Sequence, residues 1–283
     1  MIVARTRAEL ASALEQQEGR RGLVMTMGAL HTGHLTLVRR ARELADHVVV
    51  SIYVNPLQFG PNEDFDAYPR QLEEDLALLE PLGVEVVYAP SDAEMYPREP
   101  LVRIDPGPVA SVLEGATRPG HFAGVLQVVH KVMNLVRPDV AMFGQKDAQQ
   151  LALIRTMVAD LDMGIEIEAV KIARDPDGVA QSSRNAYLSE SERAWARALS
   201  RALVAGADAA EDGGSGGAVL AAAEHELERA VRESGGVVRL DYLVLVDPET
   251  FTPLASGARE GLLAVAAWVG STRLIDNRVL RLG

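Results

Sequence analysis

The fold is decided by residues 23–54, which read LVMTMGALHTGHLTLVRRARELADHVVVSIYV. Leu23 to Met27 and Val48 to Val54 are rich in apolar and β-branched residues, which predicts two buried strands. Between them, His34 to Ala45 carries apolar residues at helical spacing, which predicts a helix. A strand, a helix and a second strand joined by short connections form a βαβ unit, whose strands are parallel.

Strands and helices alternate in the same way as far as residue 172. This alternation predicts an α/β fold, namely a Rossmann-like parallel sheet with helices on both faces. Ligands then bind at the carboxyl ends of the strands. The expected helices are Pro69 to Leu79, Val125 to Val136 and Ala148 to Asp160, and the expected strands are Val84 to Tyr88, Val140 to Phe143 and Ile165 to Ile172.

The pattern changes after Arg174, which predicts a second domain. Asp175 to Gly178 (DPDG) is a strong turn signal, and Ser189 with Glu192 forms a capping box before a long helix rich in Ala and Arg. We therefore expect residues 1–175 to form the Rossmann-like domain and residues 176–283 a smaller C-terminal α+β domain. Its later segments are a Gly-rich hinge at Glu211 to Gly217, a helix at Val219 to Glu233, and strands at Arg239 to Val246, Leu262 to Val269 and Arg273 to Leu280.

Composition excludes several classes of protein. With 283 residues, of which 48% are hydrophobic, the chain can bury a full core and is not intrinsically disordered. Its net charge of −12 disfavours binding along a nucleic-acid backbone, so no nucleic-acid partner is expected. The absence of cysteine excludes disulfides and thiolate metal sites. No signal peptide or spanning segment is recognisable, so we expect a cytoplasmic location and no membrane partner.

The residues from Met27 to His34 lie between a predicted strand and a predicted helix. His31 and His34 are three residues apart at the first helical turn and face the same way, and Gly33 allows a ligand to approach the backbone. A helix N-terminus also offers unpaired N–H groups, so the segment predicts a phosphate site. The alternative is that both histidines cap the helix or lie in the core. A metal site is less favoured because no third ligand has a recognisable spacing.

Two later segments carry cationic residues. Lys146 follows a predicted strand and Gly144, which favours a role at a phosphate over that of an ordinary surface charge. Gln181 to Asn185 (QSSRN) is a polar loop whose hydroxyls and guanidinium suit a clamp over bound nucleotide, although such a loop alone is more often a linker. The order HxGH, lysine, SSR is similar to that of the HIGH/KMSKS nucleotidyltransferase superfamily, whose members use the α-phosphate of ATP.

Other residues bear on the second substrate. Gln58 ends the second strand segment and is placed to hydrogen-bond a small polar substrate, and Gln150 stands one helical turn beyond Lys146. For either glutamine taken alone, a surface role is favoured. Arg118 and His121 lie in a turn before a predicted helix. The acidic residues 73–75 suit a solvated helix face, although one carboxylate, Asp75, is a candidate ligand of Mg²⁺ bridging phosphates.

Taken together, these segments resemble the pantothenate synthetase family in their order and spacing. The resemblance runs from about residue 20 to residue 195. It departs from the family pattern at Met25, where Pro is common, and at Gln181, where Met or Leu is usual. The segments that carry it are TMGALHTGH (26–34), VNPLQFGPNEDFDAYPR (54–70), RPGHFAGVLQVV (118–129), FGQKDAQQLALIR (143–155) and SSRNAYLS (182–189).

The resemblance implies an AMP-forming ligase that joins pantoate to β-alanine through pantoyl adenylate, with ATP as substrate and Mg²⁺ as cofactor. It also implies a homodimer, an ATP- and pantoate-binding domain at 1–175 and a lid domain at 176–283. Another small-molecule nucleotidyltransferase of the superfamily is the alternative. A tRNA-charging enzyme conflicts with the pI of about 5.0. A binding protein without catalysis conflicts with the intact His31, His34, Lys146 and Arg184.

The same resemblance implies roles for single residues. His34 would be the catalytic proton donor, and His31 and Lys146 would assist at the phosphates. Gln58 would contact pantoate and β-alanine, Gln150 would contact pantoate, and Arg118 and His121 would also bind substrate. The implied ATP contacts are Met27, Gly28, Ala29, Leu30, His31, Thr32, Gly33, His34, Gly144, Gln145, Lys146, Asp147, Ala173, Gln181, Ser182, Ser183 and Arg184.

Overall fold

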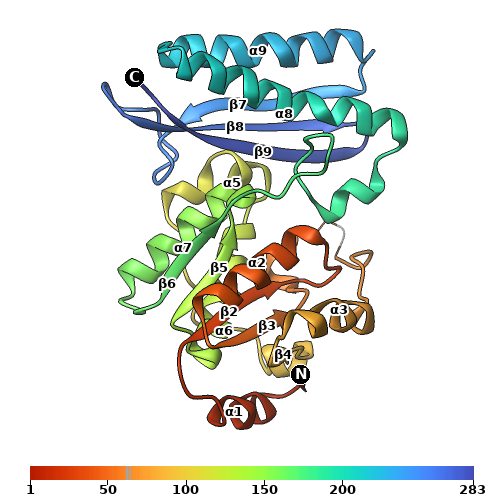
Figure 1. Cartoon of the computed structure of the whole chain (residues 1–283), viewed down its shortest axis with the longest axis vertical. Helices are drawn as coiled ribbons and strands as arrows, with labels where there is room; N and C mark the ends of the chain where they lie inside the picture. The colour runs from red at the N-terminus through yellow and green to blue at the C-terminus, as the bar shows by residue number, and fades with distance from the viewer. Residues whose placement is uncertain (62, 64) are drawn as a thin grey trace. The chain divides into compact units, whose positions relative to one another are not determined.

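The computed structural model describes residues 1–61, 63 and 65–283 (Figure 1). Residues 62 and 64, which belong to the segment 54–70 quoted above, lie outside the described residues. The chain divides into two compact units, which are described separately. The first unit contains residues 1–144 and 153–171, and the second contains residues 145–152 and 172–283.

The first unit is built on a six-stranded sheet in the order β1-β4-β3-β2-β5-β6. Every pairing in it is parallel, as the alternation of strands and helices predicts. The strand order reverses beside β2, whose neighbours are β3 on one side and β5 on the other. Such a reversal opens a crevice at the carboxyl ends of the strands. The strands are β1 Ile2–Ala4, β2 Arg21–Thr26, β3 His47–Ile52, β4 Val86–Tyr88, β5 Val140–Gly144 and β6 Glu166–Val170.

Both faces of the two central strands β2 and β3 are buried. Val24 of β2 and Val50 of β3 pack with Val38 of the helix α2 in one core cluster. Leu23 and Val49 precede them by one residue, so they face the opposite side, and both are also fully buried. On that side α6 contacts β2 and α1. The helices are α1 Arg7–Glu15, α2 Thr32–Leu44, α3 Leu72–Leu79, α4 Asp92–Met95, α5 Glu114–Thr117, α6 His121–Val136 and α7 Ala148–Asp160, and the 3-10 turns are η1 Pro56–Gln58, η2 Glu80–Leu82 and η3 Pro108–Ser111.

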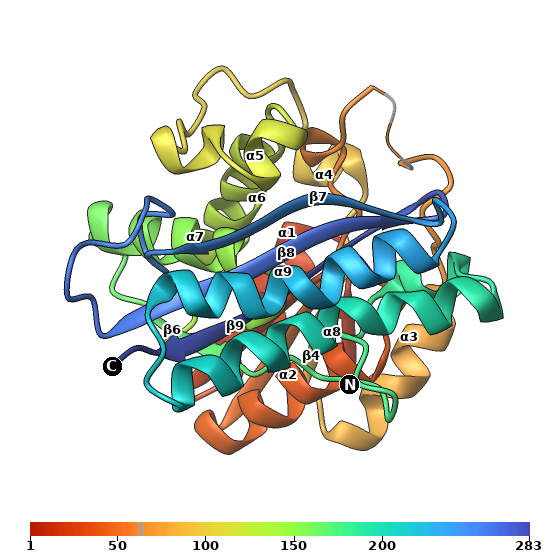
Figure 2. The same ribbon diagram turned by 90° about the horizontal axis from the view of Figure 1, so that it is seen from above.

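The second unit is a three-stranded antiparallel sheet with two long helices on one face (Figure 2). Leu199, Leu203 and Ala207 of α8 recur at helical spacing and are buried against Leu263 of β8. A Cβ on Gly206 would meet the Leu263 side chain at 2.4 Å, so the helix lies close to the sheet here because this position is glycine. The elements are η4 Gln145–Asp147, η5 Ser183–Tyr187, α8 Glu190–Glu211, α9 Gly216–Glu233, β7 Val238–Val246, β8 Glu260–Val269 and β9 Thr272–Arg281.

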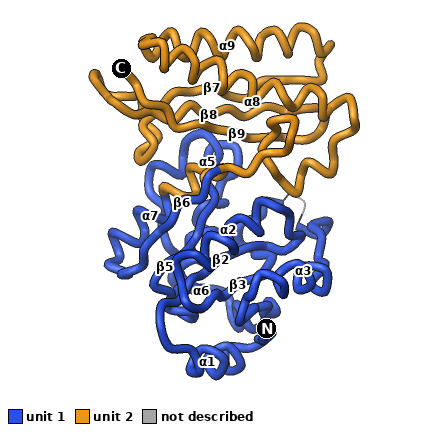
Figure 3. The backbone as a smooth tube through the Cα atoms, in the orientation of Figure 1, with its two compact units in different colours: residues 1–144, 153–171 blue, residues 145–152, 172–283 orange. Residues whose placement is uncertain are grey.

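The two units do not divide at the boundary expected between residues 175 and 176 (Figure 3). The first unit ends at Lys171, four residues earlier, and residues 145–152 belong to the second unit although they lie far earlier in the sequence. The start of α7 therefore belongs to one unit and its remainder to the other.

Most predicted elements agree with the structure to within a few residues, and α7 has the predicted bounds. Pro69 does not begin a helix, because α3 starts only at Leu72 after the cap residue Gln71. The helix predicted from Val125 starts at His121, after Gly120 adopts a left-handed conformation with φ 84°. The sequence analysis missed β1 and α1. Strand β1 has only three residues, too few to show a period, whereas the Thr6 and Glu9 capping box before α1 was a readable signal.

The cap of α8 gives the first prediction. Ser189 accepts a hydrogen bond from the N–H of Glu192, whose side chain accepts from Ser189 N. Ser189→Ala should lower the free energy of unfolding of the second unit by about 1 kcal/mol, measured by urea denaturation followed by circular dichroism. Ser191→Ala, on the same exposed turn, is the control and should change it by less than about 0.5 kcal/mol. Equal effects of the two changes would refute a specific contribution of the cap.

Candidate active site

The loop between β2 and α2 is held by the carboxylate of Asp75. Its Oδ2 accepts the N–H of Ala29 at 3.0 Å, and its Oδ1 accepts the N–H of Leu30 at 2.7 Å. The Asp75 side chain is fully buried, and this burial raises its pKa while the two N–H groups act in the opposite direction. The loop is thus fixed from α3, far along the chain.

Gly28 is required by the geometry of this loop. Its φ of 83° is left-handed, and an added Cβ would meet Asp75 Oδ2 at 2.9 Å. Its N–H donates to Thr26 Oγ1 at 3.1 Å. Ala29 also has a positive φ, 51°, which is strained for a residue with a side chain. The contacts with Asp75 therefore maintain a backbone shape that the local sequence does not favour.

His31 and His34 form a reciprocal cap at the start of α2. His31 is the N-cap, and its Nδ1 accepts the N–H of Gly33 at 3.1 Å. The Nδ1 of His34 accepts the N–H of His31 at 3.3 Å. The ring centroids are 4.0 Å apart. Because each Nδ1 is an acceptor, each neutral ring carries its proton on Nε2. The capping interpretation is therefore confirmed, and it also gives both rings an Nε2–H donor.

Gln58 lies at the end of η1 against the same loop. Its Nε2 donates to the sulfur of Met27 at 3.2 Å, and a thioether is a weak acceptor. Its Oε1 accepts from Asn55 Nδ2 at 3.1 Å. Asn55 is buried and also bonds the carbonyl of Gly124 and the hydroxyl of Tyr96. The acceptor end of the Gln58 amide is thus already engaged, and its donor end points to the Met27 side.

Arg118, the C-cap of α5, and His121, the first residue of α6, support Gln58 from its backbone. His121 Nδ1 lies 2.8 Å from the carbonyl oxygen of Gln58, and because a carbonyl only accepts, this nitrogen carries the proton. The Nε2 of His121 then accepts from Arg118 Nη1 at 3.0 Å. Arg118 also forms a bidentate ion pair with Glu63, with both N–O distances 2.6 Å. Arg118 Nη2 also donates to the carbonyl oxygen of Gln58 at 3.4 Å, so both residues contact the predicted substrate residue Gln58.

In the second unit, Lys146 lies on η4 directly after β5. The side-chain amide of Asn277, on β9, donates to the carbonyl oxygens of Gln145 at 3.0 Å and Lys146 at 2.8 Å. Gln150 lies in the first turn of α7 and is partly buried.

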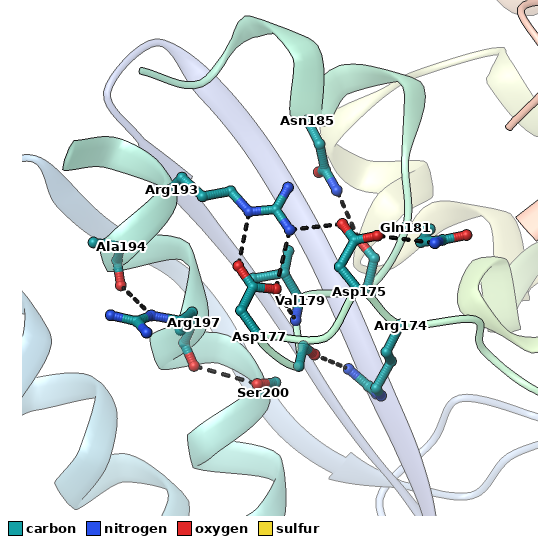
Figure 4. Close-up of polar contacts among 12 residues, drawn as sticks. Arg174, Asp175, Asp177, Val179, Gln181, Asn185, Arg193, Ala194, Arg197 and Ser200 are labelled. Atoms are coloured by element: carbon teal, nitrogen blue, oxygen red, sulfur yellow. Dashed lines mark hydrogen bonds and ion pairs between the residues drawn. The ribbon is translucent and has the colours of Figure 1, made fainter. Parts of the chain in front are cut away.

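The segment from Ala173 to Asn185 forms a short hairpin followed by η5. The carbonyl of Ala173 accepts the N–H of Gln181 at 2.9 Å, and Ser182 caps η5 by accepting the N–H of Arg184 at 3.3 Å. Figure 4 shows the Gln181 side chain directed at Asp175, to which its Nε2 donates at 2.9 Å. The carbonyl of Ala180 accepts from the side chain of Asn185 at 3.0 Å.

Arg193, near the start of α8, fastens this hairpin (Figure 4). Its guanidinium bonds Asp175 at 2.6 Å and both carboxylate oxygens of Asp177 at 2.9 and 3.0 Å. Hydrogen bonds from Arg193 hold the pKa of Asp177 below its usual range. The DPDG turn is therefore tied to the helix that follows the loop.

The expected site residues thus fall into two groups, each built within its own unit. Met27 to His34, Gln58, Arg118, His121, Asp75 and Gly144 belong to the first unit, and Gln145 to Gln150, Ala173 and Gln181 to Arg184 belong to the second. The sequence analysis missed the anchoring role of Asp75 and the contacts of Asn55, Glu63 and Asn277, because long-range contacts leave no local pattern.

In the part that the structure describes, no three or more His, Asp or Glu side chains are grouped so that they could hold a metal ion. No helix of that part is long and apolar enough to cross a membrane.

The family model of pantoate-β-alanine ligases matches residues 2–279. The chain belongs to this family. Pantothenate synthetase from Thermobifida fusca (strain YX) is 57% identical over 99% of this chain and 96% of its own length. That of Salinispora arenicola (strain CNS-205) is 56% identical over 98% of this chain and 96% of its own. The match extends well beyond residues 20–195, which carried the resemblance in sequence.

Solved structures agree with this assignment. The crystal structure of pantothenate synthetase from Thermus thermophilus has 47% identity and a TM-score of 0.91, covering 98% of this chain and 99% of that one. The pantoate-β-alanine ligase of Francisella tularensis, complexed with β-γ ATP and β-alanine, has 32% identity and a TM-score of 0.80 over 99% of this chain and 97% of that one. The Rossmann-like fold with a smaller C-terminal domain is thereby confirmed.

The cap formed by His34 and the proton-donor role that the resemblance implies for it give a prediction for this member of the ligase family. In His34→Gln the glutamine can still reach back to the N-cap N–H as in a capping box, but the imidazole Nε2–H is lost. The melting temperature should stay close to that of the wild type, while pantothenate formation should fall at least about 10²-fold. His34→Ala is the comparison, since it also loses the cap. Near-normal turnover of His34→Gln would show that His34 serves only as a cap.

Proposed function

We propose that this chain joins pantoate to β-alanine with ATP, forming pantothenate, AMP and pyrophosphate. The observation that carries the proposal is the match to the pantoate-β-alanine ligase model over residues 2–279. The Francisella ligase that was crystallised with an ATP compound and β-alanine supports two of the three substrates.

The reaction proceeds in two steps. An oxygen of the pantoate carboxylate attacks the α-phosphorus of ATP, and pyrophosphate leaves. The amine of β-alanine then attacks the carbonyl carbon of pantoyl adenylate, loses a proton, and displaces AMP. The first step needs donors placed around the phosphates, and the second needs protection of the mixed anhydride from water.

The first unit suits the phosphates and the carboxylate. The Nε2–H groups of His31 and His34 are donors at the N-terminus of α2, where anions are stabilised. We propose that His34 is the catalytic proton donor of the reaction. The Gln58 Nε2 suits the oxygens of pantoate and the carboxylate of β-alanine, because its Oε1 is already held by Asn55. Arg118 and His121 act on the substrate side by fixing Gln58.

The second unit supplies the remaining proposed contacts. Lys146 offsets charge on the phosphates, with Gln145 and Asp147 beside it. Gly144, which ends β5 in the first unit, directly precedes them. Gln150 contacts pantoate. Ala173 and the loop Gln181 to Arg184 contact the nucleotide, and residues 176–283 act as the lid, with residues 1–175 binding ATP and pantoate.

Asp75 does not fit a metal ligand. Both of its carboxylate oxygens accept backbone N–H groups, and the side chain is fully buried. We therefore expect Mg²⁺ to arrive as the complex with ATP, held through phosphate oxygens, and assign no step to a metal ion held by this chain. A homodimer, which the family resemblance implies, and a cytoplasmic location complete the proposal.

Isotope exchange tests the proposed order of steps. With ATP, Mg²⁺ and pantoate but no β-alanine, the enzyme should exchange labelled pyrophosphate into ATP, because only the reversible first step runs. Added β-alanine should then give AMP and pantothenate in equal amounts. Exchange without pantoate, or only with a phosphorylated acceptor, would favour another nucleotidyltransferase instead.

Lys146 gives a second test. Lys146→Ala removes a preorganised positive charge from the phosphates, so the rate of pantoate-dependent exchange should fall at least about 10²-fold. Lys171→Ala is the matched control, because Lys171 is exposed and follows β6. Equal rates for the two variants would show that Lys146 does not act at the phosphates.

A further inference from the structure

Strand β9 carries two adjacent buried polar residues, Asp276 and Asn277. Their exposed fractions are 3% and 6%. A buried polar side chain costs free energy unless its hydrogen bonds are made, so the partners of each residue show what its place in the strand achieves.

The amide of Asn277 holds the turn that carries Lys146. Its Nδ2 donates to two consecutive carbonyl oxygens, Gln145 at 3.0 Å and Lys146 at 2.8 Å. A flipped amide would place its oxygen against two acceptors, so the orientation is determined. The backbone on either side of the Lys146 Cα is thereby fixed from another part of the chain.

Asp276 holds the hairpin that leads to the SSR loop. Its carboxylate forms a bidentate pair with Arg174, with distances of 2.6 and 2.9 Å, and also accepts the N–H of Asn277. The Arg174 side chain in turn donates to the carbonyl of Gly178. The backbone of Arg174 pairs with that of Ala180 across the hairpin as an antiparallel β-bridge. Gln181 follows directly.

Successive residues of a strand face opposite sides of the sheet, so one short stretch of β9 anchors a different segment on each side. Leu274 and Leu280, on the same strand, are ordinary core residues. Leucine side chains thus supply the buried apolar surface of this strand, and the formation of the core does not explain the buried polar pair.

We propose that Asp276 and Asn277 are positioning residues for ATP activation. Asn277 sets the position of Lys146, and Asp276 sets that of the loop Gln181 to Arg184. The proposal rests on the proposed function, which assigns both segments to ATP.

A double-mutant cycle tests the Asn277 arm. Asn277→Ala should lower the maximal rate of pantoate-dependent pyrophosphate exchange at least about 10-fold, because a misplaced charge loses much of its effect. In the Lys146→Ala background the same change should cost less than about 2-fold, since the group that it positions is gone. Losses of equal size in both backgrounds would overturn the proposal.

A structural control separates positioning from stability. Leu274→Ala creates a cavity in the core of the same unit and should lower the melting temperature at least as much as Asn277→Ala, but should leave the maximal rate within about 2-fold. An equally large rate loss in Leu274→Ala would show that both changes act through stability.

Asn277→Asp keeps the size of the side chain and serves if Asn277→Ala does not fold. An ionised carboxylate repels the two carbonyls, whereas a protonated one donates a hydrogen bond to one of them. The rate of Asn277→Asp relative to wild type should therefore rise as the pH falls through the pKa of the new carboxyl. A constant ratio would contradict positioning.

The Asp276 arm predicts a different kinetic effect. Asp276→Asn and Arg174→Gln should each raise the KM for ATP at least about 5-fold. The KM of the double variant should not exceed that of the more impaired single variant. Additive effects would show that Asp276 and Arg174 act independently, which would contradict the proposed role of the pair. If the wild type itself shows no pantoate-dependent exchange, the proposed function fails. If the wild type exchanges and these variants match it, only the positioning proposal fails.

Discussion

The carboxylate of Asp75 is the contact on which the first unit's site depends. It holds two consecutive N–H groups of a loop whose Gly28 and Ala29 both have positive φ angles. This shape sets where α2 begins, and the start of α2 sets the mutual cap of His31 and His34. It also places Met27 beside Gln58. Asp75, a buried acid far along the chain from this loop, thus determines the geometry of residues that it does not contact.

The same device recurs in both units: a polar side chain fixes the backbone of a residue whose own side chain is proposed to work on substrate. His121 bonds the carbonyl of Gln58, and Asn277 bonds the carbonyl of Lys146. A contact with the main chain fixes the residue without using a polar atom of its side chain. It also limits the freedom that would otherwise be lost when substrate binds.

Local patterns in the sequence predict much of this molecule. The β-branched runs and helical spacing indicate the parallel sheet, and the segments around His34, Lys146 and Arg184 indicate ATP chemistry. The anchors were not predictable in this way. Asp75 reads as part of a solvated acidic face, and Asn277 is a single amide in an ordinary strand. Their roles come from partners 45 to 132 residues away in the chain, as for Leu30 and Gln145.

The membership of residues 145–152 in the second unit has a consequence for the modularity of the chain. That unit is discontinuous, because its strand β9 bonds a segment inserted between β5 and the rest of α7. A fragment consisting of residues 176–283 would lack both Arg174 and the Lys146 turn, and would leave Asp276 and Asn277 without these partners. The C-terminal domain is therefore not a transferable module, and exchange between relatives would need to carry the 145–152 segment and the 172–175 connection with it.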